Sequence, residues 1–387
     1  MAEIKDNFAN PVSFEDWKIG FAKRAKAKGV SEATLQKSFY HIKRLPKVIV
    51  YDRRQPEFSR TFGQYITSAL SQTRTKRARA MYKKHKKTLD KIAKKYGVQP
   101  RFLVAFWGLE TNFGRHVGKM DIVRSLATLS HDLRRAKFFE NELILALKIM
   151  QNGHIKGKTF YGSWAGAFGQ TQFMPSTFTA YAVDGNGDGV KDLWGSFDDI
   201  FASSSNFLKS VGWKRDETWG RQVKINNDNF DWALTGHKTK KTLKQWADLG
   251  VVKYDGSNLD TSFKGKASII IPAGANGPKF LVYNNFRRIL NWNRSDFYAL
   301  AVGLLADDIV GVDGMDWTPP KNEKAISRAD FKFVQSVLKQ HGFYNSAIDG
   351  VFGSGSRASL KLYQQKHNLP ADGHLSNEML KFVKENK

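Results

Sequence analysis

The chain has 387 residues, with 62 Lys and Arg against 36 Asp and Glu, which gives a formal net charge of +26. Its hydrophobic content of 41% and aromatic content of 13% exclude a disordered chain and predict a folded protein with a sizeable core. The absence of cysteine excludes disulfide scaffolds, thiolate zinc sites and a lipid-modified Cys within this sequence.

The first part of the chain is predicted to be helical, from residue 14 to about residue 207, because apolar residues recur there at intervals of three and four. The predicted helical segments are 14–30, 74–98, 100–110 and 136–153. Pro100 suits the first position of its helix, where a missing N–H needs no partner. The start of the chain has no signal-peptide pattern, and no stretch is long and apolar enough for a membrane span; a removed export signal would leave the same picture.

One carboxylate follows the most apolar of these segments. The stretch "AFWGLETNFGRHVGKM", from Ala105, places Glu110 after apolar and aromatic residues and before a glycine-containing turn. We expect the helix 100–110 to be buried, with Glu110 at its inner end, and burial would raise the pKa of the carboxyl. Such an acid is protonated near neutrality and can protonate a glycosidic oxygen. Alternatively, Glu110 points to solvent or caps a neighbouring helix.

Two loops follow that are rich in small and polar residues. "GSWAGAFGQTQFMPSTF", from Gly162, allows close backbone approach and offers amide groups to a polar ligand. "DGNGDGVKDLWGSFDD", from Asp184, alternates side-chain oxygens with glycines, as an EF-hand-like loop does around a hard cation. Counted from Asp184, the twelfth position, where an EF-hand loop has its last ligand Glu, is Gly195. The last ligand would therefore be Asp198, at the fifteenth position. The predicted ligands are Asp184, Asn186, Asp188, the carbonyl of Val190, and Asp198. The alternative is an Asx-turn-rich loop with no ion.

The last third of the chain changes pattern twice. β-branched and aromatic runs at 266–274 and 279–285 predict a small strand-bearing insertion, and helical spacing returns at 294–311. Two Asp-Gly turns, each followed by an amphipathic helix, then predict a small carboxy-terminal helical module. The predicted organisation is a first domain at 12–313 with an insertion at about 219–285, a linker at 314–327, and a second domain at 328–387.

Several blocks together resemble a known family. "LPKVIVYDRRQPEF", "FWGLETNFGRHVGK", "SLATLS", "RRAKFF", "GSWAGAFGQTQFMPSTFTAYAVDGNGDG" and "NWNRSDFYALAV" resemble, in that order, the lytic murein transglycosylases of the membrane-bound transglycosylase B type. The segment beginning "FVQSVLKQHGFYNSAIDGVFG" is similar to the small peptidoglycan-binding domain of many cell-wall enzymes. The resemblance implies a mainly α (α+β) fold: a lysozyme-like helical catalytic domain with a small β-containing insertion, plus a small three-helix carboxy-terminal domain.

The resemblance implies cleavage of peptidoglycan between N-acetylmuramic acid and N-acetylglucosamine without net addition of water. The family's catalytic acid falls on Glu110, which would protonate the leaving oxygen and then accept the proton of the muramyl 6-hydroxyl, leaving a 1,6-anhydro end. Ordinary glycosidases use two carboxylates. An intramolecular nucleophile makes the second unnecessary. No cofactor is needed for this chemistry, and calcium in the family's lengthened loop would be structural.

The family's binding positions are carried over residue by residue. Ser163 and Gln172 match polar residues of the cleft beside the acid, and Phe173 and Met174 match its apolar floor. A second set is implied from other segments. It consists of Arg134 and Arg135, which would hold muramyl lactate or stem-peptide carboxylates, and Asn293 and Tyr298, which would support the oxocarbenium-like state.

The expected partners are peptidoglycan glycan strands, and the expected location is the periplasm or cell envelope, with the protein acting as a monomer. The segment 74–97 is rich in Lys and Arg with a single acid, Asp90, and is best interpreted as a solvated helix face. The positive charge also predicts association with an anionic envelope surface. A nucleic-acid-binding protein is the alternative, although no recognised nucleic-acid motif accompanies the charge. Two further interpretations are a cell-wall-binding protein without catalysis and a hydrolytic muramidase.

Overall fold

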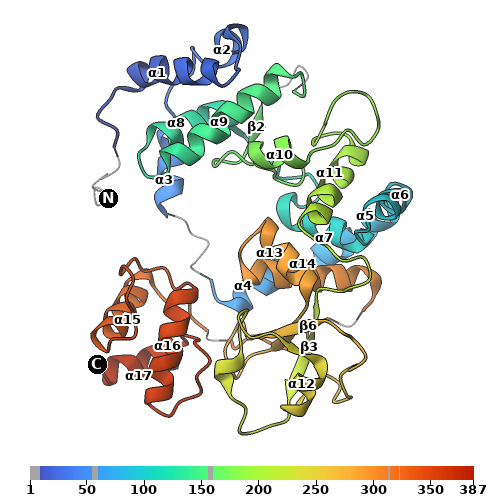
Figure 1. The fold of residues 1–387 in the computed structure, drawn as a ribbon, viewed down its shortest axis with the longest axis vertical. Helices are drawn as coiled ribbons and strands as arrows, with labels where there is room; N and C mark the ends of the chain where they lie inside the picture. Colours follow the sequence, from blue (N-terminus) through green and yellow to red (C-terminus); the bar gives the residue numbers. More distant parts are fainter. Residues whose placement is uncertain (1–8, 55–59, 156–159, 313, 322) are drawn as a thin grey trace. The chain divides into compact units, whose positions relative to one another are not determined.

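A computed structural model gives the fold. It describes residues 9–54, 60–155, 160–312, 314–321 and 323–387. These residues form two compact units (Figure 1). The first unit draws on residues 1–55 and 77–211, and the second on 56–76 and 212–387. Within the described ranges, no helix has both the length and the apolar character needed to cross a membrane.

The first unit is built almost entirely from helices. They are α1 (Phe14–Ala27), α2 (Glu32–Ser38), α3 (Pro46–Arg54), α6 (Lys86–Tyr96), α7 (Pro100–Thr111), α8 (Ile122–His131), α9 (Ala136–Gln151), α10 (Pro175–Tyr181) and α11 (Phe197–Ser210). Helices α8 and α9 pack against each other, and α6 packs against α11 (Figure 1). A short antiparallel pair joins β1 (Met120–Asp121) to β2 (Tyr161–Gly162), with Met120 opposite Gly162.

The prediction of one continuous helix over 74–98 is wrong. The segment forms α5 (Gln72–Lys84), which crosses the division between the units, and then α6, with His85 between them at φ −102° and ψ 15°. The His85 ring lies 4.1 Å from the Phe197 ring and 5.5 Å from the Trp107 ring, centroid to centroid. These contacts hold the His85 imidazole against rings of α7 and α11 at the point where α5 ends and α6 begins. Helical periodicity carries no information on such contacts between distant segments.

The second unit contains a five-stranded antiparallel sheet with the order β4-β6-β7-β3-β5. Its strands are β3 (Gly220–Ile225), β4 (Lys241–Thr242), β5 (Val251–Lys253), β6 (Lys266–Ile270) and β7 (Lys279–Val282). Its helices are α4 (Phe62–Ala69), α12 (Leu243–Asp248), α13 (Asn284–Trp292), α14 (Asp296–Val310), α15 (Arg328–Gln340), α16 (Ser354–Lys366) and α17 (Asn377–Glu385). The fold-class prediction is therefore confirmed: mainly helical, with small sheets and a three-helix carboxy-terminal part (Figure 1).

The carboxy-terminal helices α15, α16 and α17 share a core that includes Leu338, Leu360 and Val383. They also contact the strand-bearing segment through main-chain atoms. Lys361 of α16 donates from Nζ to the carbonyl oxygens of Thr235 (2.6 Å), Ala233 (3.2 Å) and Trp232 (3.4 Å). The carboxylate of Asp372 accepts the backbone N–H of Ala275 at 2.9 Å. The module is therefore docked within the second unit.

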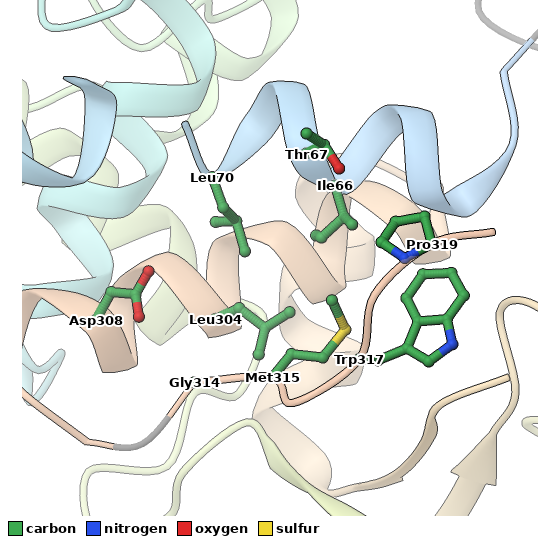
Figure 2. Close-up of a pocket in the computed structure, with 9 residues that line it drawn as sticks. All are labelled: Ile66, Thr67, Leu70, Leu304, Asp308, Gly314, Met315, Trp317 and Pro319. Carbon is green, nitrogen blue, oxygen red and sulfur yellow. The ribbon is translucent and has the colours of Figure 1, made fainter. Parts of the chain in front are cut away.

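The segment predicted as a linker is packed along part of its length. Asp316 accepts from Gln222 Nε2 at its carbonyl (3.1 Å) and donates its own N–H to Gln222 Oε1 (2.9 Å). Gly314, Met315, Trp317 and Pro319 then line one side of an open cavity of about 260 Å³ whose other side is formed by α4 and α14 (Figure 2). In Figure 2, Ile66 of α4, Leu70 directly after that helix and Leu304 of α14 extend toward Met315. None of the predicted site residues lines this cavity.

Candidate active site

Helix α7 carries Glu110 in its last turn. Pro100 occupies the first turn of the helix, and every residue from Phe102 to Gly108 is buried, which confirms the predicted burial of this segment. Glu110 itself is half-buried rather than enclosed. The helix ends at Thr111 and is capped by Asn112, which lies in the left-handed region at φ 50°; the next residue, Phe113, also has a positive φ of 61°. These two residues turn the chain away from the axis of α7 directly after the turn that carries Glu110.

Gln170 fixes the end of α7 to the loop that follows β2. Its side-chain oxygen accepts the indole N–H of Trp107 at 2.6 Å, and its amide donates to the carbonyl of Trp194 at 2.6 Å. Its backbone carbonyl accepts the hydroxyl of Thr111, next to the acid, at 2.7 Å. Gln170 is 8% exposed, so these hydrogen bonds are protected from water. Sequence reasoning noted two glutamines in this loop but selected only Gln172.

The four predicted cleft residues lie together on the loop between β2 and α10. Ser163 accepts the Ala167 N–H at its hydroxyl (3.0 Å), which curls the loop. Gln172 has a positive φ of 52° and donates to the Val117 carbonyl at 3.2 Å, joining this loop to the one after α7. Phe173 is buried, and Met174 is half-buried just before α10. The structure thus brings these four residues to the same part of the first unit as the loop that follows Glu110.

The two loops approach each other at a pair of glycines. Gly118 has φ +92°, and a Cβ placed there would lie 2.1 Å from the carbonyl carbon of Gly162 and 2.7 Å from the backbone nitrogen of Ser163. No side chain fits at this contact, so glycine is required. The contact sets the path of residues 114–119 beside the Ser163 loop.

The arginine pair is held by a carboxylate that sequence reasoning missed. Arg134 donates from Nε to Asp52 at 2.6 Å, and Arg135 also donates to Asp52. Asp52, on α3, is 2% exposed. Its burial alone would raise the pKa, but the hydrogen bonds from the two guanidinium groups outweigh this, so the pKa of Asp52 lies below its usual value. Asp52 lies within the block "LPKVIVYDRRQPEF", where no spacing rule connects it to arginines 82 and 83 positions away.

Asn293 and Tyr298 belong to the second unit, whereas Glu110 belongs to the first. Asn293 caps the carboxy-terminal end of α13, is exposed, and accepts the Ser295 N–H at its side-chain oxygen (3.1 Å). Tyr298 lies in the first turn of α14 and is 6% exposed. Their assignment to the site stays a prediction.

The loop after α10 has the hydrogen bonds of a series of Asx turns. Asp184 accepts the N–H groups of Gly187 (2.6 Å) and Gly189 (2.7 Å), and Asp188 accepts that of Val190 (2.8 Å). These backbone hydrogen bonds, that from Gly189 most of all, hold the pKa of Asp184 below its usual value. Gly187 and Gly189 have φ of +86° and +83°, which lets the chain curl around the side-chain oxygens.

Asp198, predicted to be the last calcium ligand of this loop, forms an ion pair instead. Asp198 is in the first turn of α11 and lies 3.3 Å from the ammonium of Lys91. Asp199, fully buried, instead accepts the N–H groups of Gly185 (2.9 Å) and Asp192 (2.7 Å). Over the described residues, no three His, Asp or Glu side chains form a ready metal site. Calcium at this loop stays a prediction.

Comparison with known proteins assigns the chain to a family. A model described as Transglycosylase SLT domain matches residues 13–307, and a model of a peptidoglycan binding domain matches residues 327–383. The chain belongs to the transglycosylase SLT family. The family resemblance and the lysozyme-like catalytic fold predicted from the sequence are thereby confirmed.

Three similar proteins illustrate the relationship. Membrane-bound lytic murein transglycosylase B of Escherichia coli is 33% identical over 232 residues, a match that spans 59% of this chain and 62% of that protein. SltB3 of Pseudomonas aeruginosa, solved with NAG-anhNAM-pentapeptide, is 39% identical with a TM-score of 0.92, covering 96% of this chain and 99% of SltB3. Slt35 of E. coli, solved with calcium, is 27% identical with a TM-score of 0.66, covering 80% and 98%.

Proposed function

We propose that this protein is a lytic transglycosylase that cleaves the bond between N-acetylmuramic acid and N-acetylglucosamine in peptidoglycan and leaves 1,6-anhydro ends. The observation that carries the proposal is the position of Glu110 at the end of a buried helix, beside the loop bearing Ser163 and Gln172, in a chain of the SLT family. SltB3, its relative, was solved with an anhydro-sugar ligand.

The number of carboxylates supports a non-hydrolytic reaction. In residues 100–119 and 160–178, which include α7, β2, the two loops and the start of α10, Glu110 is the one acidic residue; Glu142 of α9 contacts this region, and its buried carboxylate accepts the Ser176 N–H at 2.9 Å. Hydrolytic glycosidases of both stereochemical types use a second carboxylate as nucleophile or base. A nucleophile on the substrate itself removes that requirement, because it is already held at high effective concentration.

The proposed reaction has two proton transfers at one side chain. Glu110, as the acid, gives its proton to the glycosidic oxygen as the bond to the anomeric carbon breaks. The resulting carboxylate then takes the proton of the muramyl 6-hydroxyl as that oxygen bonds to the anomeric carbon. Glu110 ends protonated, and no water is consumed. Gln170, through Trp107 and Thr111, would keep the end of α7 in place.

Mass spectrometry of the products of sacculus digestion tests this function. Anhydro-muramyl ends are expected, whereas a hydrolytic muramidase would give reducing ends heavier by one water. Release of neither product by a folded protein would favour a cell-wall-binding role without catalysis and would overturn the proposal.

We propose that the loop at 184–198 holds a structural calcium ion, with no part in the chemistry. Oxygen donors alternate at Asp184, Asn186 and Asp188, and the left-handed glycines let the loop curl, as a hard cation requires. To complete the site, the Asp198 carboxylate would have to break its ion pair with Lys91 and bind the calcium ion instead. Calcium in the relative Slt35 supports the idea.

We also propose action in the periplasm or cell envelope, where peptidoglycan lies, with contact to anionic envelope surfaces. Helix α6 and the end of α5 present exposed Lys83, Lys84, Lys87 and Lys95 against the one acid of these helices, Asp90. Lysines spread along a helix act as point charges and favour a salt-sensitive attraction to any polyanion. No specific nucleic-acid recognition is proposed.

A further inference from the structure

The stem peptides of peptidoglycan carry carboxylates, and the arginine pair expected to bind them is already engaged. Arg134 uses Nε and Nη2 on Asp52, and Arg135 uses Nη2 on the same carboxylate. Asp52 therefore neutralises part of the positive charge that a substrate carboxylate would meet there. Cations elsewhere near the acid would meet a substrate carboxylate without this competition.

The loop directly after Glu110 supplies such cations. Arg115, His116 and Lys119 are all exposed, and residues 111–119 contain no acid. In the part of the chain that the structure describes, none of these three side chains has an ion pair or a hydrogen bond. Arg115 and Lys119 are therefore fixed positive charges with unused donors, while His116 adds charge only when protonated.

This loop is anchored rather than free. The backbone N–H of Gly114 donates to the hydroxyl of Thr111 at 3.0 Å, and that of His116 donates to the carbonyl of Thr111 at 2.9 Å. The Val117 carbonyl accepts from Gln172 at 3.2 Å. These bonds attach the loop to the residue that follows the acid and to a predicted cleft residue, so its cations are held in the same region.

The position of Lys119 is the most closely defined. Gly118 packs against the backbone of Gly162 and Ser163, and the next residues pair in register, with Met120 opposite Gly162. Lys119 therefore lies between these two contacts. Continuing the antiparallel register by one residue places it opposite Ser163 of the adjacent segment. A long ammonium side chain at this position can reach a group attached to a sugar bound beside Ser163.

We propose that Arg115 and Lys119 bind the carboxylates of the stem peptide and make the enzyme prefer peptide-bearing glycan strands. This rests on the proposed transglycosylase function. In a peptide-bearing strand the lactate carboxyl of each muramyl sugar is tied up in the amide bond to the peptide, so the peptide carboxylates are what two unpaired cations in this loop would recognise. The contact lies away from the reacting bond and is made equally in the ground state and the transition state, so it lowers KM and leaves kcat unchanged.

The test compares glycan strands with and without the stem peptide; amidase hydrolysis frees the lactate carboxylate of each muramyl sugar, so both substrates carry carboxylates and only one carries those of the peptide. Initial rates of anhydro-end release are measured on glycan strands with intact stem peptides and on the same strands stripped of peptide by an amidase. With peptide present, KM is expected to rise about threefold for Arg115→Gln or Lys119→Gln and roughly tenfold for the double variant. On stripped strands the KM of every variant should equal that of the wild type. Lys119→Arg should retain the wild-type KM.

A matched control removes the same charge elsewhere in the first unit. Lys23 and Lys37 are exposed, and the double variant Lys23→Gln/Lys37→Gln should leave KM unchanged on both substrates. Equal KM changes on both substrates, or an equal effect of the control, would overturn the peptide assignment. Wild-type protein that releases no anhydro ends from either substrate would instead overturn the proposed function, and the assignment with it.

Discussion

The indole N–H of Trp107 meets the side-chain oxygen of Gln170 at 2.6 Å, although the two residues are 63 positions apart. This bond attaches the loop that carries Gln170 to the buried part of α7, three residues before Glu110. Because Gln170 also bonds the Trp194 carbonyl and the Thr111 hydroxyl, one side chain and its backbone join three segments of the first unit. Its removal should therefore affect both stability and catalysis.

We expect Gln170→Leu to lower the free energy of unfolding by about 1–3 kcal/mol, because the buried Trp107 N–H loses its acceptor. Chemical denaturation measures this, and Gln36→Leu, on the exposed face of α2, is the control with little expected effect. In a double-mutant cycle with Trp107→Phe, the two losses should not add. Additive losses would contradict the coupling.

We expect Glu110→Gln to keep the fold and abolish turnover, since an amide preserves the shape but can neither donate the acidic proton nor accept the next one. Muropeptide release from sacculi measures turnover, and the melting temperature checks the fold. Release at the wild-type rate by a folded variant would refute the role of Glu110.

We expect Asp52→Asn to lower the free energy of unfolding by about 2–3 kcal/mol, since Arg134 and Arg135 lose a buried counter-charge but remain partly exposed to water. The pKa of Asp52 is lower in the folded chain than in the unfolded one. Its contribution is thus present above the unfolded pKa of about 3.9 and is lost as pH falls through the folded value.

The wild type should accordingly lose stability below about pH 4 more steeply than Asp52→Asn does. Asp90→Asn, which breaks only the exposed pair with Lys86, is the matched control and should change stability little. A variant whose pH profile runs parallel to the wild type would mean that Asp52 is not the group responsible.

We expect millimolar calcium to raise the melting temperature of chelator-treated protein, because a ligand that binds the native form stabilises it by mass action, by about 2.7 kcal/mol at a hundred times its Kd. Magnesium should do much less, since it demands tighter geometry. Replacing Asp184 and Asp188 together by Asn should abolish the calcium response. A melting temperature indifferent to calcium, with no metal in elemental analysis of untreated protein, would leave a plain Asx-turn loop.

We expect loss of residues after about Lys321 to weaken pull-down onto intact sacculi while preserving turnover of soluble glycan, since the module raises local substrate concentration. Lys361→Met tests the docking separately, because it removes the ammonium that Thr235 and its neighbours accept. Faster proteolysis between 314 and 327 is expected for it and not for Lys381→Met, an exposed control on α17. Unchanged sacculus binding by the truncated protein would refute the binding role of the module.

What the sequence predicted well was local. Pro100 at the start of α7, the apolar surround of that helix and the strand-bearing runs before Asn285 each follow from spacing and residue type, and they placed Glu110 and the Ser163 loop correctly on their elements. What it missed depends on contacts between distant segments. Asp52 reaches its arginines across 82 positions or more, and the break at His85 follows from aromatic rings on other helices.

The choice between the two glutamines of the loop was missed for the same reason. Gln170 and Gln172 are alike in type and setting along the chain, and only the fold turns one toward Trp107 and the other toward Val117. Residue type can mark a loop as polar and glycine-rich, but it does not say which side chain faces the interior.

The docking of the carboxy-terminal module has a consequence for how freely this protein can be varied or re-engineered. Lys361 contacts three backbone carbonyls and the Thr235 hydroxyl, and Asp372 contacts a backbone N–H, so the attachment depends mainly on the main-chain path of the partner segment. Substitutions at Ala233 or Ala275 should therefore leave the attachment intact, and modules from relatives could be grafted if they keep the Lys and the Asp. The glycines of that turn are the exceptions. A Cβ at Gly274 would lie 2.8 Å from the Asp372 carboxylate and 2.9 Å from the His374 ring, and one at Gly277 would lie 2.6 Å from the Ala273 Cβ, so a graft has to keep both glycines.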